Sequence, residues 1–169
     1  PEISGCTPLV NGFVVGGGGP NARLLDGAGS HPLGDARNLA RGLGKTVRFT
    51  TESELNAVAA HFAPAPEPAN YRTYEVAGTA HIDYWRYLLG NKIDEYQFGI
   101  TDDAAFACDL PLNRIRTGIP LSAVQHRLAR WIKYGESPPP SAFMDFEGSL
   151  ADGTAAWVRD ADGNVTGGV

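Results

Sequence analysis

The sequence is short of the features that usually reveal a protein's partners. It contains no run of ~18 apolar residues and so offers no candidate transmembrane helix. It has no basic stripe or patch, and its formal net charge is -5, which argues against nucleic acid as a partner. It has only two cysteines, Cys6 and Cys108, and their separation fits no metal-binding or redox motif. What remains, with 43% hydrophobic and 20% charged residues, is typical of a globular protein.

The cysteines and the chain ends do not fix a compartment. Cys6 and Cys108 could pair in a disulfide or stay as buried free thiols. The sequence begins at Pro1 without an initiator methionine or a signal peptide, and it stops at Val169 directly after two glycines. We expect it to be a piece of a longer chain, here called the parent protein. A periplasmic or secreted location would require a signal peptide in the preceding part of that chain.

The 169 residues predict a single partial domain in three parts. Residues 1–44 form a glycine-rich, loop-like or lid-like lead, in which residues 9–15 could make a short strand. Residues 45–135 carry the predicted α/β elements, and residues 136–169 form a proline-containing linker and a β-hairpin tail. The glycines at 16–19 lead into Pro20 and lack the Lys-Ser/Thr of a phosphate-binding loop, so we interpret them as a surface loop.

Two segments have the composition of strands. Lys45–Thr51 alternates in polarity, which puts Val47 and Phe49 on one face, and Tyr71–Val76 follows after a proline-rich spacer. Two strands with one covering helix cannot close a parallel core. We therefore expect Lys45–Thr51 to have an unpaired edge and to expose Val47 and Phe49.

The clearest helix signal runs from about Pro120 to Tyr134. Ser122-x-x-Gln125 resembles a capping box, and Gly135 can end the helix before three prolines. The aromatic-rich segment 82–89 is also predicted helical, whereas residues 94–113 are predicted irregular. His126 lies on the polar side of the main helix, where we expect it to be solvated. The apolar face of this helix consists of Leu121, Val124, Leu128, Trp131 and Ile132.

A histidine and two acids follow the predicted strands. Small residues at 77–80 let the chain turn and place His81 at the end of the sheet, and histidine suits proton transfer near neutral pH. Glu52 and Glu54 follow the first strand, where open α/β sheets place catalytic groups. The alternatives are an idle loop histidine and acids that only favour a helix start. His81-x-Asp83 offers two metal ligands without a third, so no metal site is predicted.

An acid after one strand and a histidine after the next is the Ser…Asp/Glu…His order of α/β-hydrolases. Tyr74–His81 resembles the histidine motif of the bacterial alpha/beta hydrolase domain-containing proteins, and Thr51–Leu55 is similar to their acid motif. The resemblance covers most of residues 45–169. It continues through a Cys-x-x-Pro-x-Asn pattern at Cys108, Pro111 and Asn113, through Trp131-Ile132 with Gly135 before the prolines, and through Arg159–Asn164 with Gly167-Gly168.

The resemblance implies the C-terminal part of an α/β-hydrolase-type sheet, with its last two strands, covering helices and a β-hairpin tail. His81 would be the general base of a serine hydrolase and Glu54 the acid that orients it, with Glu52 as the alternative acid. The sequence has no Gly-x-Ser-x-Gly motif, so the serine is expected upstream of Pro1. The chain would act on an ester or similar acyl substrate together with the missing N-terminal part of the same fold. It would need no cofactor and would be inactive alone.

Two other functions fit the same residues. The chain could be a hydrolase-like binding module that kept the fold without the chemistry. It could also be an interaction fragment whose glycine-rich lead docks on a partner chain. A serine motif in the parent protein would favour the enzyme over both alternatives.

Overall fold

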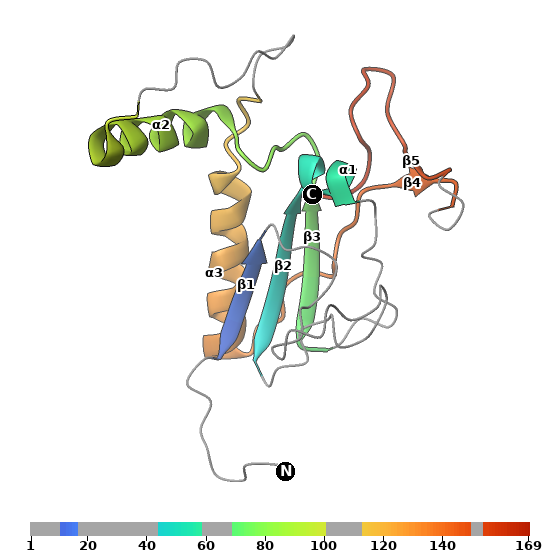
Figure 1. Cartoon of the computed structure of the whole chain (residues 1–169). Helices are drawn as coiled ribbons and strands as arrows, with labels where there is room; N and C mark the ends of the chain where they lie inside the picture. The colour runs from blue at the N-terminus through green and yellow to red at the C-terminus, as the bar shows by residue number, and fades with distance from the viewer. Residues whose placement is uncertain (1–10, 17–43, 59–68, 101–112, 150–153) are drawn as a thin grey trace, which may run out of the picture.

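The computed structural model describes residues 11–16, 44–58, 69–100, 113–149 and 154–169. A three-stranded parallel sheet with the spatial order β1-β2-β3 forms its centre (Figure 1). The strands are β1, Gly12–Gly16; β2, Lys45–Thr51; and β3, Tyr71–Val76. The bounds of β2 and β3 are those predicted from the alternation of polar and apolar residues.

Helices and a small second sheet surround the parallel strands. α1, Glu52–Val58, begins where β2 ends; α2 is Tyr84–Phe98 and α3 is Gly118–Tyr134. Figure 1 shows α3 running along the sheet, whereas α2 points away from it near the carboxyl ends of the strands. The second sheet pairs β4, Phe146–Glu147, with β5, Ala156–Trp157, in antiparallel orientation.

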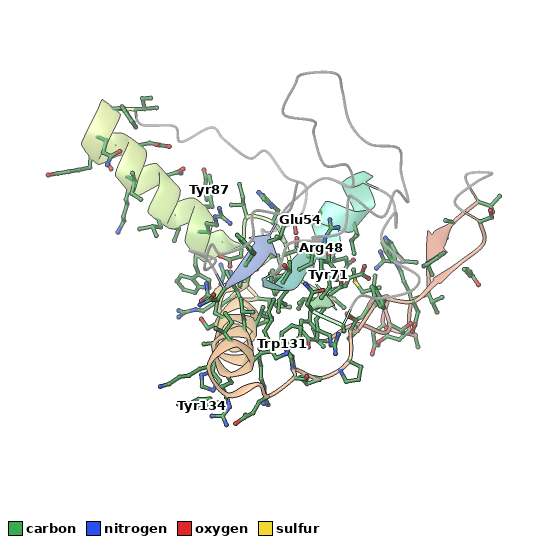
Figure 2. All side chains as sticks on the ribbon, turned by 90° about the horizontal axis from the view of Figure 1, so that it is seen from below. Arg48, Glu54, Tyr71, Tyr87, Trp131 and Tyr134 are labelled. Carbon is green, nitrogen blue, oxygen red and sulfur yellow. The ribbon has the colours of Figure 1, made fainter. Side chains whose placement is uncertain are left out.

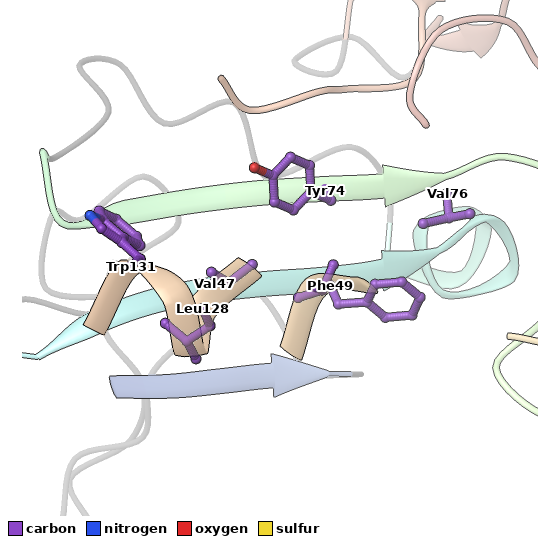
Figure 3. Close-up of a cluster of buried hydrophobic side chains, with 7 residues drawn as sticks. Val47, Phe49, Tyr74, Val76, Leu128 and Trp131 are labelled. Carbon is purple, nitrogen blue, oxygen red and sulfur yellow. The ribbon is translucent and has the colours of Figure 1, made fainter. Parts of the chain in front are cut away.

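The main core lies between α3 and one face of the parallel sheet (Figure 3). Alternate residues of β2 and β3 point toward α3, and every third or fourth residue of α3 points back at the strands. The apolar face predicted for this helix is therefore confirmed. The cluster consists of Val47, Phe49, Tyr74, Val76, Val124, Leu128 and Trp131, with Leu121 and Ile132 packed against it.

The prediction of two strands is wrong, because β1 adds a third at the edge of the sheet. The short strand considered at residues 9–15 is thus confirmed in part, since residues 12–16 form β1 within the segment interpreted as a loop-like lead. Val14 packs against the α3 core, and Gly12 lets Ile132 and the β2 backbone come close. A Cβ on Gly12 would lie 2.6 Å from Ile132 Cδ1 and 2.8 Å from the Lys45 carbonyl oxygen. This glycine is a packing requirement of the strand.

The expectation of an exposed Lys45–Thr51 strand is also wrong. β2 is the central strand, with β1 paired on one edge and β3 on the other. Val47 is 0% and Phe49 4% exposed beneath α3. The physical reason is β1, which occupies the edge that a two-stranded sheet would have left open.

The C-terminal segment attaches to the outer edge of β3. The Ala142 N–H donates to the Thr73 carbonyl at 3.0 Å, and the Glu75 N–H donates to the Ala142 carbonyl at 3.0 Å. The Glu75 carboxylate accepts the Met144 N–H at 2.8 Å. The Val169 N–H donates to the Glu75 carbonyl at 3.0 Å, so the chain ends beside the carboxyl end of β3 (Figure 1).

The ends of two helices differ from their predictions. α2 continues to Phe98, through part of the segment predicted irregular, and stops at Gly99. α3 begins at Gly118, and Ser122 lies inside the helix, where its hydroxyl donates to the Gly118 carbonyl at 2.7 Å. The capping-box prediction at Ser122 is therefore wrong, whereas Gly135 ends α3 as predicted.

Some predicted features fall outside the described residues. These are Cys6, Cys108, Pro111, the glycines at 17–19 and the proline-rich spacer at 64–68. Among the helices in the described ranges, none is long and apolar enough to span a membrane.

Candidate functional site

The acid Glu54 is fixed at the junction of β2 and α1. β2 runs into α1 without a loop, so Glu54 lies in the first turn of the helix. Its Oε2 accepts the Thr51 backbone N–H at 2.7 Å and the Thr51 hydroxyl at 2.9 Å. An acid three residues into a helix that binds the N–H of the cap residue is half of a capping box. The arrangement leaves Oε1 for another partner.

That partner is His81, whose Nδ1 lies 2.6 Å from Glu54 Oε1. The two side chains meet because β2 and β3 are parallel neighbours, so the residues after each strand lie at the same edge of the sheet. The side chain of Glu54 is 12% exposed and that of His81 is 52% exposed. A sheltered acid thus faces an imidazole that solvent can reach.

Hydrogen bonds keep Glu54 ionised. Burial raises the pKa of this carboxyl, but the Thr51 N–H, the His81 ring and the Thr51 hydroxyl outweigh burial and lower the pKa below its usual value. A carboxylate here favours a proton on Nδ1 of His81 and stabilises an imidazolium. Nε2 is then the nitrogen that can exchange a proton with another molecule.

The neighbouring residues of Glu54 hold the loop that carries His81. Glu52, the alternative acid, accepts the Gly78 N–H through Oε2 at 2.8 Å and lies 3.5 Å from Arg159 through Oε1. The Ser53 hydroxyl accepts the His81 backbone N–H at 2.8 Å. Of these three consecutive residues, Glu54 is the one whose side chain meets the imidazole ring.

Thr51 and Ser53 were not identified as site residues from the sequence. The signal for Thr51 is the Thr-x-x-Glu spacing at residues 51–54, which is typical of a helix start. Ser53 has no comparable signal, because its hydrogen bond depends on a loop that follows a different strand. Asn113, the last residue of the Cys-x-x-Pro-x-Asn pattern, donates through Nδ2 to the Gly78 carbonyl at 2.5 Å.

Asp83 does not share a metal site with His81. Its Oδ1 accepts the Arg86 N–H at 2.8 Å and its Oδ2 accepts the Thr117 N–H at 2.9 Å. Across the residues that the structure describes, no group of three or more His, Cys, Asp and Glu side chains could hold a metal ion.

A polar layer covers the sheet face opposite α3. Arg48, Tyr71 and Glu75 are buried there, and in Figure 2 Arg48 and Tyr71 lie across the sheet from Trp131 of α3. Burial raises the pKa of the Glu75 carboxyl, and the Met144 N–H and the Arg48 charge offset this only in part. The Arg48 charge interacts electrostatically with the carboxylates of Glu75 and Glu54.

A parallel sheet, covering helices and an acid–histidine pair at the carboxyl edge define an α/β protein with a hydrolase-type fold. The chain matches the family model described as "Alpha/beta hydrolase domain" over residues 4–169, and it belongs to that family. The matched range includes β1, Glu54 and His81. Comparisons with curated proteins and with solved structures found no match.

Proposed function

We propose that this chain supplies the general base and the acid of a serine-dependent α/β hydrolase that cleaves an ester or similar acyl substrate. His81 is the base, and Glu54 is the acid that orients it. The observation that carries the proposal is the 2.6 Å contact between His81 Nδ1 and Glu54 Oε1. Membership of the alpha/beta hydrolase domain family supports the same class of reaction.

The orientation of the imidazole gives the order of proton transfers. With Nδ1–H donated to Glu54, the lone pair of Nε2 takes the proton of a serine hydroxyl as the serine oxygen attacks the ester carbonyl carbon. The imidazolium, stabilised by Glu54, gives this proton to the departing alkoxide. A water molecule then loses a proton to Nε2 and cleaves the acyl-serine bond, and His81 returns the proton to the serine oxygen.

The serine is proposed to come from the parent protein upstream of Pro1. The sequence has no Gly-x-Ser-x-Gly motif. The Ser53 hydroxyl binds the backbone N–H of His81 and not its imidazole ring. Ser53 also lies on the same helix as Glu54. Because β2 is covered on both edges, an exposed strand is no longer an argument for a missing part. The proposal rests on the absent serine motif.

Ester hydrolysis by the parent protein tests this function. We would measure kcat/KM for a short-chain nitrophenyl ester in the parent protein and in its His81→Ala variant. His126→Ala is the matched control, because His126 is an exposed residue of α3. The proposal predicts a loss on the order of 10⁴-fold or more for His81→Ala and no loss for the control.

The same assay locates the nucleophile. Residues 1–169 alone are expected to show no His81-dependent hydrolysis. If the chain alone hydrolysed the ester at a rate that His81→Ala abolished, the proposal of an upstream serine would be refuted while the role of His81 would stand.

A further inference from the structure

The loop that carries His81 has its polar backbone groups bound by two different elements. The N–H groups of Gly78 and His81 are bound by side chains of α1. The carbonyl groups of Gly78 and Ala80 are bound by the segment that leads into α3, through Asn113 at 2.5 Å and the Thr117 hydroxyl at 3.1 Å. α1 and the start of α3 therefore hold the same short loop.

Asp83 fixes the second of these supports. Its side chain is buried, with the residue 5% exposed. Oδ1 accepts the Arg86 N–H at 2.8 Å and caps α2, while Oδ2 accepts the Thr117 N–H at 2.9 Å. Thr117 is the N-cap residue of α3. One carboxylate thus ties the start of α3 to the start of α2.

The hydrogen bonds of Thr117 reach the chain on both sides of His81. The Thr117 N–H donates to the side chain of Asp83, two residues after His81. The Thr117 hydroxyl donates to the carbonyl of Ala80, the residue directly before His81. A displacement of the backbone between Ala80 and Asp83 relative to Thr117 would stretch or break one of these bonds. The His81 ring can stay 2.6 Å from Glu54 only while this backbone stays in place.

We propose that Asp83 and Thr117 are positioning residues that hold the His81 backbone so that its imidazole remains on Glu54. This inference rests on the proposed function of the His81–Glu54 pair. Asp83 and Thr117 act through the backbone of His81, since their hydrogen bonds go to backbone groups. Such support matters for a base because a misplacement of ~1 Å can cost ~100-fold in rate.

The exchange of the His81 Nδ1 proton with water tests this positioning without any activity assay. A proton held between the ring and Glu54 is expected as a resolved, downfield signal in the ¹H NMR spectrum of the 169-residue chain. Asp83→Asn keeps the size of the side chain but points an amide N–H₂ at a backbone N–H donor. Thr117→Val keeps the branched shape and removes only the hydroxyl. Asp94→Asn makes the same chemical change at an exposed position of α2 and is the control.

We expect Asp83→Asn and Thr117→Val each to speed the exchange of this proton about fivefold or more, the factor that corresponds to the loss of one hydrogen bond. Asp94→Asn should leave the exchange unchanged, and the amide protons of β2 and β3 should keep their wild-type rates in all variants. Unchanged exchange of the Nδ1 proton in both test variants would overturn the inference. Equal acceleration of the sheet amides would overturn it too, since the residues would then only support the fold.

A missing Nδ1 signal in the wild-type chain would also overturn the inference, because no ring would then be held on Glu54. The failure of the proposed function has a different signature. A parent protein that shows no His81-dependent ester hydrolysis would refute the function and leave this NMR comparison unchanged.

Discussion

Both carboxylate oxygens of Glu54 accept hydrogen bonds, Oε2 from Thr51 and Oε1 from His81. A glutamine has one accepting and one donating end, so Glu54→Gln would either set its N–H₂ against the Thr51 donors or require the His81 tautomer in which Nδ1 accepts, and both arrangements lose the charge-assisted bonds. We expect this variant to lower the free energy of unfolding by about 1–3 kcal/mol at neutral pH, measured by urea denaturation.

Glu136→Gln is the matched control for this prediction. Glu136 pairs with Arg130 at 2.6 Å, but both side chains are largely exposed, at 48% and 41%. Exposed ion pairs contribute ~1 kcal/mol or less, so the control should lose little stability. Equal losses in the two variants would contradict the account of Glu54 as a doubly bonded, sheltered acid.

The lowered pKa of Glu54 also sets a pH dependence. A carboxyl group whose pKa is lower in the folded than in the unfolded state stabilises the fold above its unfolded pKa of about 4.3. This contribution is lost as the pH falls through the lowered, folded-state pKa. The difference in unfolding free energy between wild type and Glu54→Gln should therefore shrink as the pH is lowered below about 4. A difference that grows as the pH falls below about 4 would be inconsistent with the Thr51 and His81 hydrogen bonds.

The order of strands, acids and histidine could predict that His81 pairs with an acid, whereas the choice of Glu54 over Glu52 depended on the family resemblance alone. The order of strand, acid, strand and histidine suffices for the pairing, because parallel strands bring their carboxyl ends together. Glu52 and Glu54 follow the same strand, and their directions depend on where α1 begins. Since α1 starts at Glu52 itself, the two side chains point about 200° apart around the helix, and Glu54 faces His81.

Among the elements, β1 depends on Gly12, its first residue, for close packing against β2 and α3. Gly12→Ala would bring a Cβ to 2.8 Å from the Lys45 carbonyl oxygen and 2.6 Å from Ile132 Cδ1. We expect this substitution to lower the free energy of unfolding by about 1–3 kcal/mol, because the β2 backbone or α3 must shift. Thermal or urea unfolding followed by circular dichroism would measure it.

Gly90→Ala is the control for the same chemical change. Gly90 lies inside α2, and a Cβ there would meet no atom within 4 Å. Alanine is the better helix former by about 1 kcal/mol, so this variant should be neutral or slightly stabilised. If Gly12→Ala behaved like Gly90→Ala, the close packing of β1 on β2 and α3 would be wrong.

Glu75 joins β3 to the C-terminal segment and is predicted to titrate in the opposite sense to Glu54. Its pKa is raised by burial, so the folded state binds more protons than the unfolded state between about pH 4.3 and the raised value. The wild type should therefore lose stability relative to Glu75→Gln as the pH rises through this window. Urea unfolding of both proteins between about pH 4 and 7 measures this difference.

Glu147→Gln, at an exposed acid of β4, is the control for the Glu75 experiment. A constant difference between wild type and Glu75→Gln across this pH range would mean that the carboxylate is not desolvated at the junction of β3 and the tail. A wild type that gains stability as the pH rises would mean that Arg48 and the Met144 N–H dominate over burial.

The elements that the sequence could predict are those with a one-sided burial pattern. β2, β3 and α3 each bury one regular face, and their apolar residues recur with the period of a strand or a helix. β1 is short and begins and ends in glycine, so the sequence indicates a possible strand at residues 9–15 but neither its bounds nor its place in the sheet. None of the described residues of α2 is buried. The sequence therefore has no helical repeat of apolar residues from which the end of α2 could be predicted.

For the whole molecule, the ordered set of motifs predicted the family before any contact between them was visible. The family match over residues 4–169 confirms this resemblance and extends it across β1. The pairing of β1 with β2 could not be predicted from the motifs, because it depends on which residues pack under α3. The substrate also leaves no signature in the acid–histidine pair, since the proton transfers proposed for this pair are the same whichever acyl and alcohol groups the ester carries.

Labelling of the parent protein with a fluorophosphonate probe, which reacts with an activated serine, tests whether His81 and Glu54 activate a serine. We expect the wild-type parent and His126→Ala to be labelled, Glu54→Gln to be labelled far more slowly, and His81→Ala not to be labelled. Labelling of His81→Ala at the wild-type rate would contradict the role of His81 as base. An intact parent protein that is not labelled at all would contradict the enzyme and favour a hydrolase-like binding module.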